Sequence, residues 1–216
     1  TRVRSSAASD VYKRQELKKK SAYLKQLFEG IYTCGEVHGM YRPVFYRNKV
    51  HAVVGLDKKK GIVTGTYAEG THRLIPVDDC MIEDQKADSI IATLRTLFAS
   101  FKYAPYNEDT HRGFMRHILI RRGFSTKEIM VVLVTADNKF PSKNNFIKAL
   151  LEQHPDITTI IQNINDLSTS MILGKANKVL YGKGYIEDVL CGCRFRISPE
   201  SVSYTHLRAH ETSLHL

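Results

Sequence analysis

Residues 114–134 read FMRHILIRRGFSTKEIMVVLV, and this stretch decides the fold. Two β-rich runs, Phe114 to Arg122 and Glu128 to Val134, flank the turn residues 123–126. Because a polar turn between two such runs is typical of a hairpin, we expect two antiparallel strands here. The second run is nearly all apolar, which indicates a strand buried on both faces near the centre of a sheet.

The segments around this hairpin predict the rest of an α+β fold. A strand over 46–54 should place Arg47, Lys49 and His51 on one face, because side chains alternate along a strand. Apolar residues at helical spacing predict helices over 16–31, over 84–101 and after Ser142, which we expect to act as an N-cap. Further strands are expected over 62–67, up to residue 75 and over 158–163, with a small meander of short strands over 179–197. Hairpins with interspersed helices favour a mainly antiparallel sheet with flanking helices.

The two ends of the chain differ from its interior. Residues 1–15 show neither helical nor strand periodicity, and residues 202–216 hold three histidines after a strand-like segment that stops abruptly. Both resemble translated sequencing-adapter read-through, so we expect them to be non-native and the true protein to occupy residues 16–201.

Composition narrows the class of protein. The chain has 216 residues, a net charge of +10 and 43% hydrophobic residues, which excludes a disordered or low-complexity protein. It has no run of about 18 apolar residues, so we expect no membrane partner. Four scattered cysteines and no secretory signal favour the reducing cytoplasm. The basic excess favours a polyanionic partner, with nucleic acid first.

Several segments, read in order, resemble one family: the bacterial RNA uracil-C5 methyltransferases of the type that modifies large-subunit (23S) ribosomal RNA. The segments that carry the resemblance are Tyr46-Arg47-Asn48-Lys49-Val50, Gly70-Thr71-His72-Arg73, Val77-Asp78-Asp79-Cys80, Leu119-Ile120-Arg121-Arg122-Gly123 and Phe195-Arg196-Ile197-Ser198-Pro199-Glu200-Ser201. Each segment alone is weak evidence for the resemblance, which depends on the order of the segments over residues 16–201.

The resemblance implies a larger protein of three parts: an oligonucleotide-binding barrel, a central α/β domain with a [4Fe–4S] cluster, and a class I (Rossmann-type) methyltransferase domain. Residues 16–201 are similar to the central domain alone, with the catalytic domain missing. The implied cofactors are S-adenosylmethionine and the cluster. We expect neither on this fragment, which lacks the catalytic cysteine and the glycine-rich cofactor loop, and we expect ribosomal RNA as partner of a monomer.

Cys80 is the candidate metal ligand. From the residues alone, a buried cysteine acting as a small hydrophobe is the favoured interpretation. The resemblance implies instead the fourth thiolate of the cluster in the intact protein. The pair Cys191 and Cys193 is interpreted as a hairpin turn with two incidental thiols, and Cys34 carries no expectation of function.

The candidate RNA-binding residues are basic and lie on two predicted strands. They are Arg47, Lys49, His51, Arg116, Arg121 and Arg122. Together they would form a surface for phosphates and folded RNA, since phosphate contacts supply affinity and register. For any single residue, a solvated charged face is the competing interpretation. The acidic residues 78, 79, 83 and 84 are interpreted as helix first-turn charge.

Two functions follow as hypotheses. The first is the RNA-facing central part of an S-adenosylmethionine-dependent 23S rRNA (uracil-C5) methyltransferase, inactive as this fragment. The alternative is a stand-alone basic RNA-binding module without catalysis.

Overall fold

The computed structural model describes residues 7–40, 43–57, 59, 61–168 and 171–201. The chain divides into two compact units, residues 1–43 and 44–216. The described residues of the first unit contain one helix, α1 (Ala7–Leu27). This helix begins at Ala7, so the predicted start at residue 16 is wrong. The helix formers Lys13, Arg14 and Gln15 continue the helical backbone without an apolar periodicity to announce it. The remaining terminal residues, 1–6 and 202–216, lie outside the described part.

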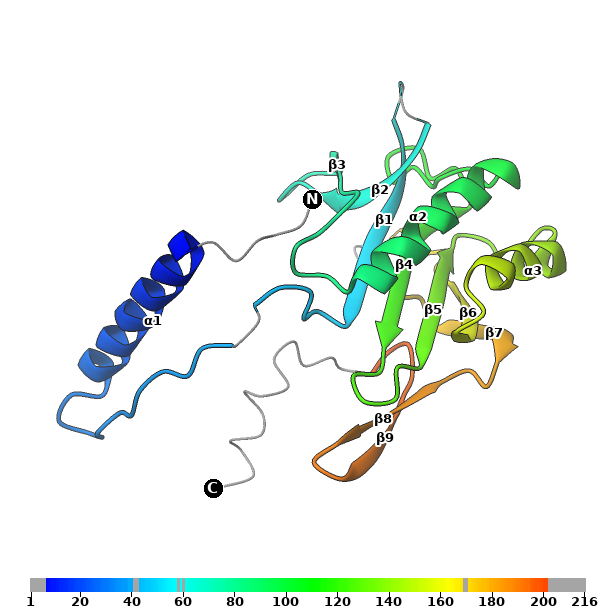
Figure 1. Cartoon of the computed structure of the whole chain (residues 1–216). Coiled ribbons are helices and arrows are strands. Elements are labelled where there is room, and N and C mark those ends of the chain that lie inside the picture. Colours follow the sequence, from blue (N-terminus) through cyan, green and yellow to red (C-terminus); the bar gives the residue numbers. More distant parts are fainter. Residues whose placement is uncertain (1–6, 41–42, 58, 60, 169–170, 202–216) are drawn as a thin grey trace. The chain divides into compact units, whose positions relative to one another are not determined.

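A seven-stranded sheet lies at the centre of the second unit, in the order β3-β2-β1-β4-β5-β6-β7 (Figure 1). Its strands are β1 (Lys49–Asp57), β2 (Gly61–Tyr67), β3 (Leu74–Pro76), β4 (Met115–Arg122), β5 (Ile129–Thr135), β6 (Ile157–Ile164) and β7 (Ala176–Gly182). All neighbours pair antiparallel except β5 and β6, which are parallel. The predicted α+β class with a mainly antiparallel sheet is confirmed, and all seven residues of β5 are buried, as its apolar run predicts.

Helices α2 (Gln85–Ser100) and α3 (Lys143–Gln153) cover one face of the sheet (Figure 1). The predicted stripe of α2 is buried at Ile90, Leu94 and Phe98, each 0% exposed, against Ile118 and Ile120 of β4. This packing supplies most of the apolar burial of the unit, which is the dominant favourable contribution to folding. We refer to this side as the helix face.

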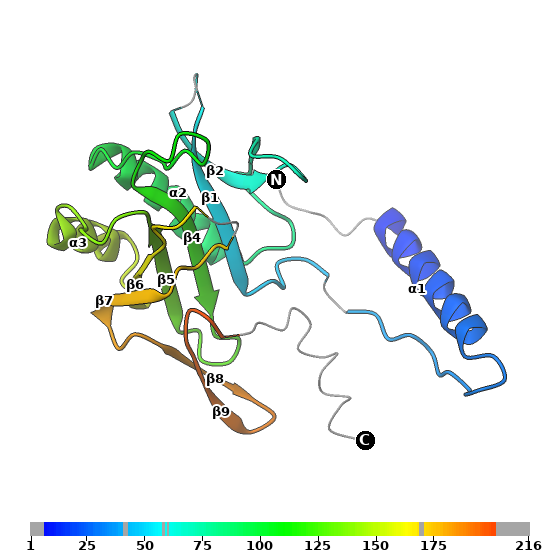
Figure 2. The same cartoon turned by 180° about the vertical axis from the view of Figure 1, so that it is seen from behind.

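The opposite face, seen from behind in Figure 2, carries a smaller apolar cluster. Leu119, Met130, Val132 and Ile161 pack there against Ile186 of a separate two-stranded sheet. That sheet consists of β8 (Ile186–Leu190) and β9 (Cys193–Ile197). We refer to this side as the open face, because the hairpin covers only its β4–β6 portion.

Two local expectations are corrected by the structure. Ser142 stands at the N-cap position of α3 with φ of 48°, and its side chain makes no capping hydrogen bond. The predicted meander over 179–197 is divided, since β7 joins the large sheet while β8 and β9 pair only with each other. Between them Cys191 and Gly192 both have positive φ, so the predicted hairpin turn is confirmed.

Candidate nucleic-acid interface

Lys49 and Arg121 lie opposite each other on the open face, at the start of β1 and the end of β4. The antiparallel register pairs them directly. Their neighbours Val50 and Ile120 point into the core of the helix face, so by strand alternation Lys49 and Arg121 point the other way. Two like charges at directly opposed positions repel one another. The arrangement therefore favours an anion between or beside them.

Arg121 is 4% exposed, and only part of its hydrogen-bond donors have partners. One Nη2 hydrogen bond goes to the carbonyl oxygen of Ser201, while Nε has no partner among the described residues. Burial lowers the pKa of Arg121, and Glu200 acts in the opposite direction. Burial, followed by the nearby charge of Arg121, also lowers the pKa of Lys49. Both cations thus lack full charge compensation within the described chain.

Two histidines continue this face. The rings of His51 and His117 lie 5.0 Å apart between centroids. Burial, helped by the charge of Lys49, lowers the pKa of His51 to about 4. Burial also lowers the pKa of His117 to about 3, with His51 and Arg116 adding to the shift. Both imidazoles are therefore neutral near pH 7, and each ring offers one donor and one acceptor nitrogen.

The histidines line a cleft of about 720 Å³ on the open face. Its other walls come from the end of β2, the loop that follows it and segments before β4 and β7. The lining residues are His51, Val53, Thr66, Tyr67, Ala68, Glu69, Gly70, Thr71, His72, Glu108, His117, Ser168 and Ile172. The Gly70-Thr71-His72 segment, singled out in the sequence, thus lies beside His51 and His117 in space.

Arg116 lies apart from Lys49 and Arg121, and its side chain is engaged by other groups of the protein. Its side chain is 1% exposed and donates to both carboxylate oxygens of Glu108, at 2.9 and 2.8 Å from Nη2. Nη1 donates to the carbonyl oxygens of Asn165 and Leu167. The guanidinium also stacks over Tyr106 at 4.5 Å. A β-bulge between Met115 and His117 takes Arg116 out of the strand alternation.

Arg122 points away from Lys49, and Arg47 lies outside β1. Arg122 is one residue beyond Arg121, so it points to the helix face, where Nη1 lies 2.9 Å from Oδ2 of Asp84. Arg47 precedes β1 and forms an isolated bridge with Glu83. The expected cluster on β4 is therefore not formed. Of the predicted RNA-binding residues, the open face brings together Lys49, His51 and Arg121.

Cys80 is half-buried in the segment before α2, where its amide donates to Asp88. It lines a small pocket with Arg47, Glu83 and Asp88. No group of three or more metal-ligating side chains occurs among the residues that the structure describes. A [4Fe–4S] cluster needs four thiolates, so the described residues alone do not fit it. Cys34, Cys191 and Cys193 are free thiols.

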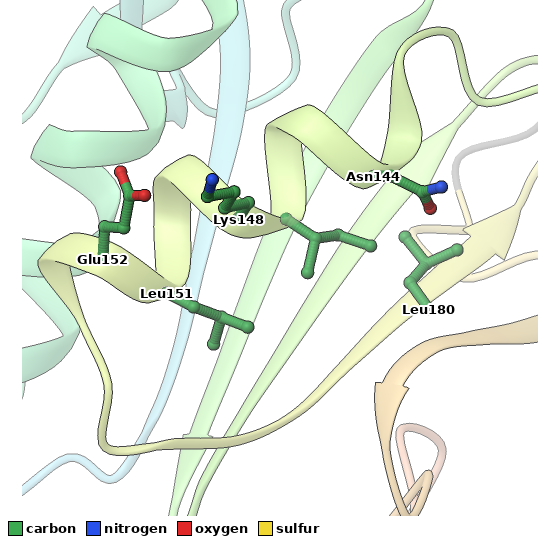
Figure 3. A pocket seen from close by; sticks show the side chains of 6 residues that line it. Asn144, Lys148, Leu151, Glu152 and Leu180 are labelled. Atoms are coloured by element: carbon green, nitrogen blue, oxygen red, sulfur yellow. The ribbon is translucent and has the colours of Figure 1, made fainter.

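A second hollow, of about 490 Å³, lies on the helix side between α3 and β7 (Figure 3). Its apolar lining comes from Ile147, Leu151 and Leu180, and its polar lining includes Lys148 and Glu152. It offers no nucleophile or buried polar atom without a partner. Lys148 is useful as a reference cation, because it lies on the opposite side of the sheet from Lys49.

The sequence indicated His51 directly, but it did not join His51 to Tyr67, His72 or Glu108. Their convergence depends on the pairing of β1 with both β2 and β4. The alternation of side chains along its strand was the sequence signal that placed His51 on one face. No comparable signal linked the loops at either side of the cleft, because loops have no side-chain period.

Comparisons with known proteins give a consistent result. No family model matches the chain. An RNA methyltransferase of Oceanobacillus iheyensis is 42% identical over 164 residues, which is 76% of this chain and 36% of the relative. One from Clostridium tetani is 42% identical over 166 residues, covering 77% and 36%. One from Staphylococcus aureus strain COL is 34% identical over 163 residues, covering 76% and 36%. The chain thus spans about a third of the length of these curated relatives.

The fold also matches a solved structure. The tRNA (uracil-54, C5)-methyltransferase of Pyrococcus abyssi, solved in complex with S-adenosyl-L-homocysteine, superposes with a TM-score of 0.73. The match covers 94% of this chain and 47% of that chain at 21% identity. No helix in the described part of the chain is long and apolar enough to cross a membrane.

Proposed function

The chain belongs to the RNA methyltransferase family, and on that premise we propose that it is the central, RNA-facing part of a uracil-C5 methyltransferase acting on 23S ribosomal RNA. In this proposal the complete protein uses S-adenosylmethionine, works as a cytoplasmic monomer and comprises further domains. Residues 16–201 form its central domain, and the segments 1–15 and 202–216 are non-native. The chain by itself transfers no methyl group.

The incompletely compensated Lys49–Arg121 pair is the observation that supports the RNA-binding role. Burial of Arg121 at 4% exposure is costly unless an anion completes its hydrogen bonds. A phosphodiester suits it, because a guanidinium donates to two phosphate oxygens at once. Lys49, directly opposite, adds a second charge for the same or the next phosphate. The chain's contribution to the reaction is therefore to hold the RNA backbone in register.

This positioning matters to uracil methylation. An enzyme that modifies a base must take it out of the stack, which costs a few kcal/mol. Phosphate contacts on either side of an extruded nucleotide help to offset that cost and fix the strand. S-adenosylmethionine supplies the methyl group in such enzymes. The described residues include no glycine-rich loop that would hold it.

A stand-alone RNA-binding module is the second candidate function. It is favoured by the fact that Lys49, Arg121 and the histidine cleft all lie within the second unit. The two candidates agree on RNA binding and differ only in catalysis. Methyl transfer by a longer protein that contains this chain separates them.

RNA binding is tested with the full 216-residue chain and a uridine-containing fragment of 23S ribosomal RNA. Lys49→Ala should weaken binding about tenfold and lower the slope of log K against log salt by about 1. Lys148→Ala removes the same charge from the helix side and should leave the affinity nearly unchanged. Equal effects of the two substitutions would reject a specific role for Lys49.

Catalysis is tested on the protein encoded by the genomic sequence around this chain. With ribosomal RNA and labelled S-adenosylmethionine, we expect label at C5 of uracil. A genuine stop codon after Ser201, or no incorporation, would leave the stand-alone module.

For Cys80 we propose the role of fourth cluster ligand in that longer protein. Cys80→Ser should then remove the brown chromophore, and Cys191→Ser should not. A retained chromophore in Cys80→Ser would refute this role.

A further inference from the structure

The cleft beside Lys49 contains buried polar atoms that the described protein does not satisfy. Nε2 of His51 and Nδ1 of His117 are buried and have no hydrogen-bond partner among the described residues. His117 is only 6% exposed. A buried polar atom left without a partner loses its hydrogen bonds to water and gains none in return. Two of them at one cleft indicate a site built for a ligand that supplies the missing partners.

The character of the walls selects the chemistry of that ligand. Tyr67 contributes a half-buried ring at one side, with His72 next to it at 5.7 Å between ring centroids. Aromatic side chains of this kind stack on unpaired nucleobases. Burial raises the pKa of Tyr67, so its phenol keeps its proton and stays a donor. Aromatic rings with nearby neutral donors and acceptors are suited to a planar heterocycle.

Negative charge on the walls excludes a phosphate from the cleft itself. Glu69 and Glu108 both line it. Nη2 of Arg116 donates to both carboxylate oxygens of Glu108, so this guanidinium is already engaged and is not available to a phosphate in the cleft. Glu69 would repel a phosphate in the cleft, whereas an uncharged base is not repelled. The anion belongs outside, at Lys49 and Arg121.

The spacing along β1 connects the two places. Lys49 and His51 point to the same face and are two residues apart, which is about 6.6 Å along a strand. A single nucleotide can bridge that interval with its phosphate at Lys49 and its base beside His51. The cleft volume of about 720 Å³ lies within the range of small-molecule sites and accommodates a base with its ribose.

We propose that the cleft lined by His51, His117 and Tyr67 binds one unstacked nucleobase of the RNA while Lys49 and Arg121 hold its phosphate. This inference rests on the proposed RNA-binding function and deepens it.

The test uses the full chain and two heptamer RNAs, one of seven uridines and one in which every base is replaced by an abasic ribose. Both carry the same phosphates, so Lys49→Ala should weaken both. If the cleft binds a base, the uridine heptamer should bind at least about tenfold more tightly than the abasic heptamer, because stacking of a base on aromatic side chains adds affinity. Tyr67→Ala and His117→Phe should each remove most of that difference, whereas Lys148→Ala should not.

Each outcome bears on a different proposal. If the two heptamers bind equally and Lys49→Ala weakens both, the phosphate contact holds and the base site is refuted. If neither RNA binds, the proposed function fails with it. Because His117→Phe alters a buried position, its thermal unfolding is compared with wild type. Tyr67 is only half-buried, so Tyr67→Ala keeps the test decisive if His117→Phe does not fold.

Discussion

Arg122 donates to both carboxylate oxygens of Asp84, at 3.2 and 2.9 Å, and Asp84 is the N-cap of α2. Asp84 also accepts from the amides of Lys86 and Ala87. One carboxylate thus ties the end of β4 to the start of the main core helix. The contact gives Arg122 a structural role on the helix face, away from Lys49 and Arg121.

This contact predicts a loss of stability without a loss of RNA affinity. Arg122→Ala should lower the free energy of unfolding by about 1 kcal/mol, because the pair is partly exposed. Asp84→Ala should cost more, since it also removes the cap, which contributes about 1 kcal/mol. Urea unfolding measures both. A tenfold weaker RNA affinity of a fully stable Arg122→Ala would contradict the assignment.

Substitutions in the buried Arg116–Glu108 pair should lower the free energy of unfolding much more. Arg116→Leu leaves the carboxylate of Glu108, 14% exposed, without its partner, and a cost of about 3–5 kcal/mol is expected. Glu108→Gln should cost less, because Arg116 keeps its bonds to the carbonyls of Asn165 and Leu167. Denaturant unfolding decides the order, and an Arg116→Leu protein as stable as wild type would refute it.

Lys49 should lower the stability of the free protein while it supports RNA binding. Lys49→Met removes the repulsion with Arg121 and should stabilise the free chain by up to about 1 kcal/mol. The same substitution should weaken binding of the uridine heptamer. Thermal unfolding and binding titration with one preparation test this opposition. Lower stability together with unchanged binding would show that Lys49 is a packing residue instead.

Stability should fall in mild acid because of His51 and His117. Their pKa values, about 4 and about 3, lie below the value of about 6.5 expected in the unfolded chain. Below pH 6.5 the unfolded chain therefore binds more protons than the folded one. Each histidine costs up to about 1.4 kcal/mol per pH unit as pH falls from 6.5 towards 4, and the dependence fades below about 3.

The control for this pH dependence is the double variant with His51→Phe and His117→Phe. Its stability should change less between pH 7 and 5 than that of wild type. The lowered pKa of His154 and the raised pKa values of Glu83 and Asp88 are common to both proteins and cancel in the comparison. Identical slopes for the two proteins would show that neither histidine is held neutral.

Asp188 should hold the β8–β9 hairpin to the sheet. Its carboxylate accepts from the amides of Phe124, Ser125 and Thr126 in the β4–β5 turn. Asp188→Ala should cost about 1–2 kcal/mol and increase hydrogen exchange in β9. Glu187→Ala removes only an ion pair with the exposed Arg194 and should cost less than about 1 kcal/mol. Unchanged exchange in β9 after Asp188→Ala would count against the anchor.

The spacing of apolar residues predicted an element correctly where the pattern within that one segment shows which of its residues are buried. The apolar spacing of α2 and the continuous apolar run of β5 predicted a helix packed on a central strand, which the structure confirms. It failed at α1, whose residues 7–15 are helical without an apolar stripe. It also failed for β7, because a short strand does not reveal whether it will join the large sheet or pair locally.

The sequence by itself determined the order of the elements, the α+β class and the basic character of β1, because side-chain period and composition are local properties. Only the tertiary structure decided what each basic residue of β4 does. A bulge buries Arg116 against Glu108, strand alternation sends Arg122 to Asp84, and the register with β1 leaves Arg121 facing Lys49. Three arginines of one strand differ because the partner of a charge is set by residues distant in the chain, which only folding brings together.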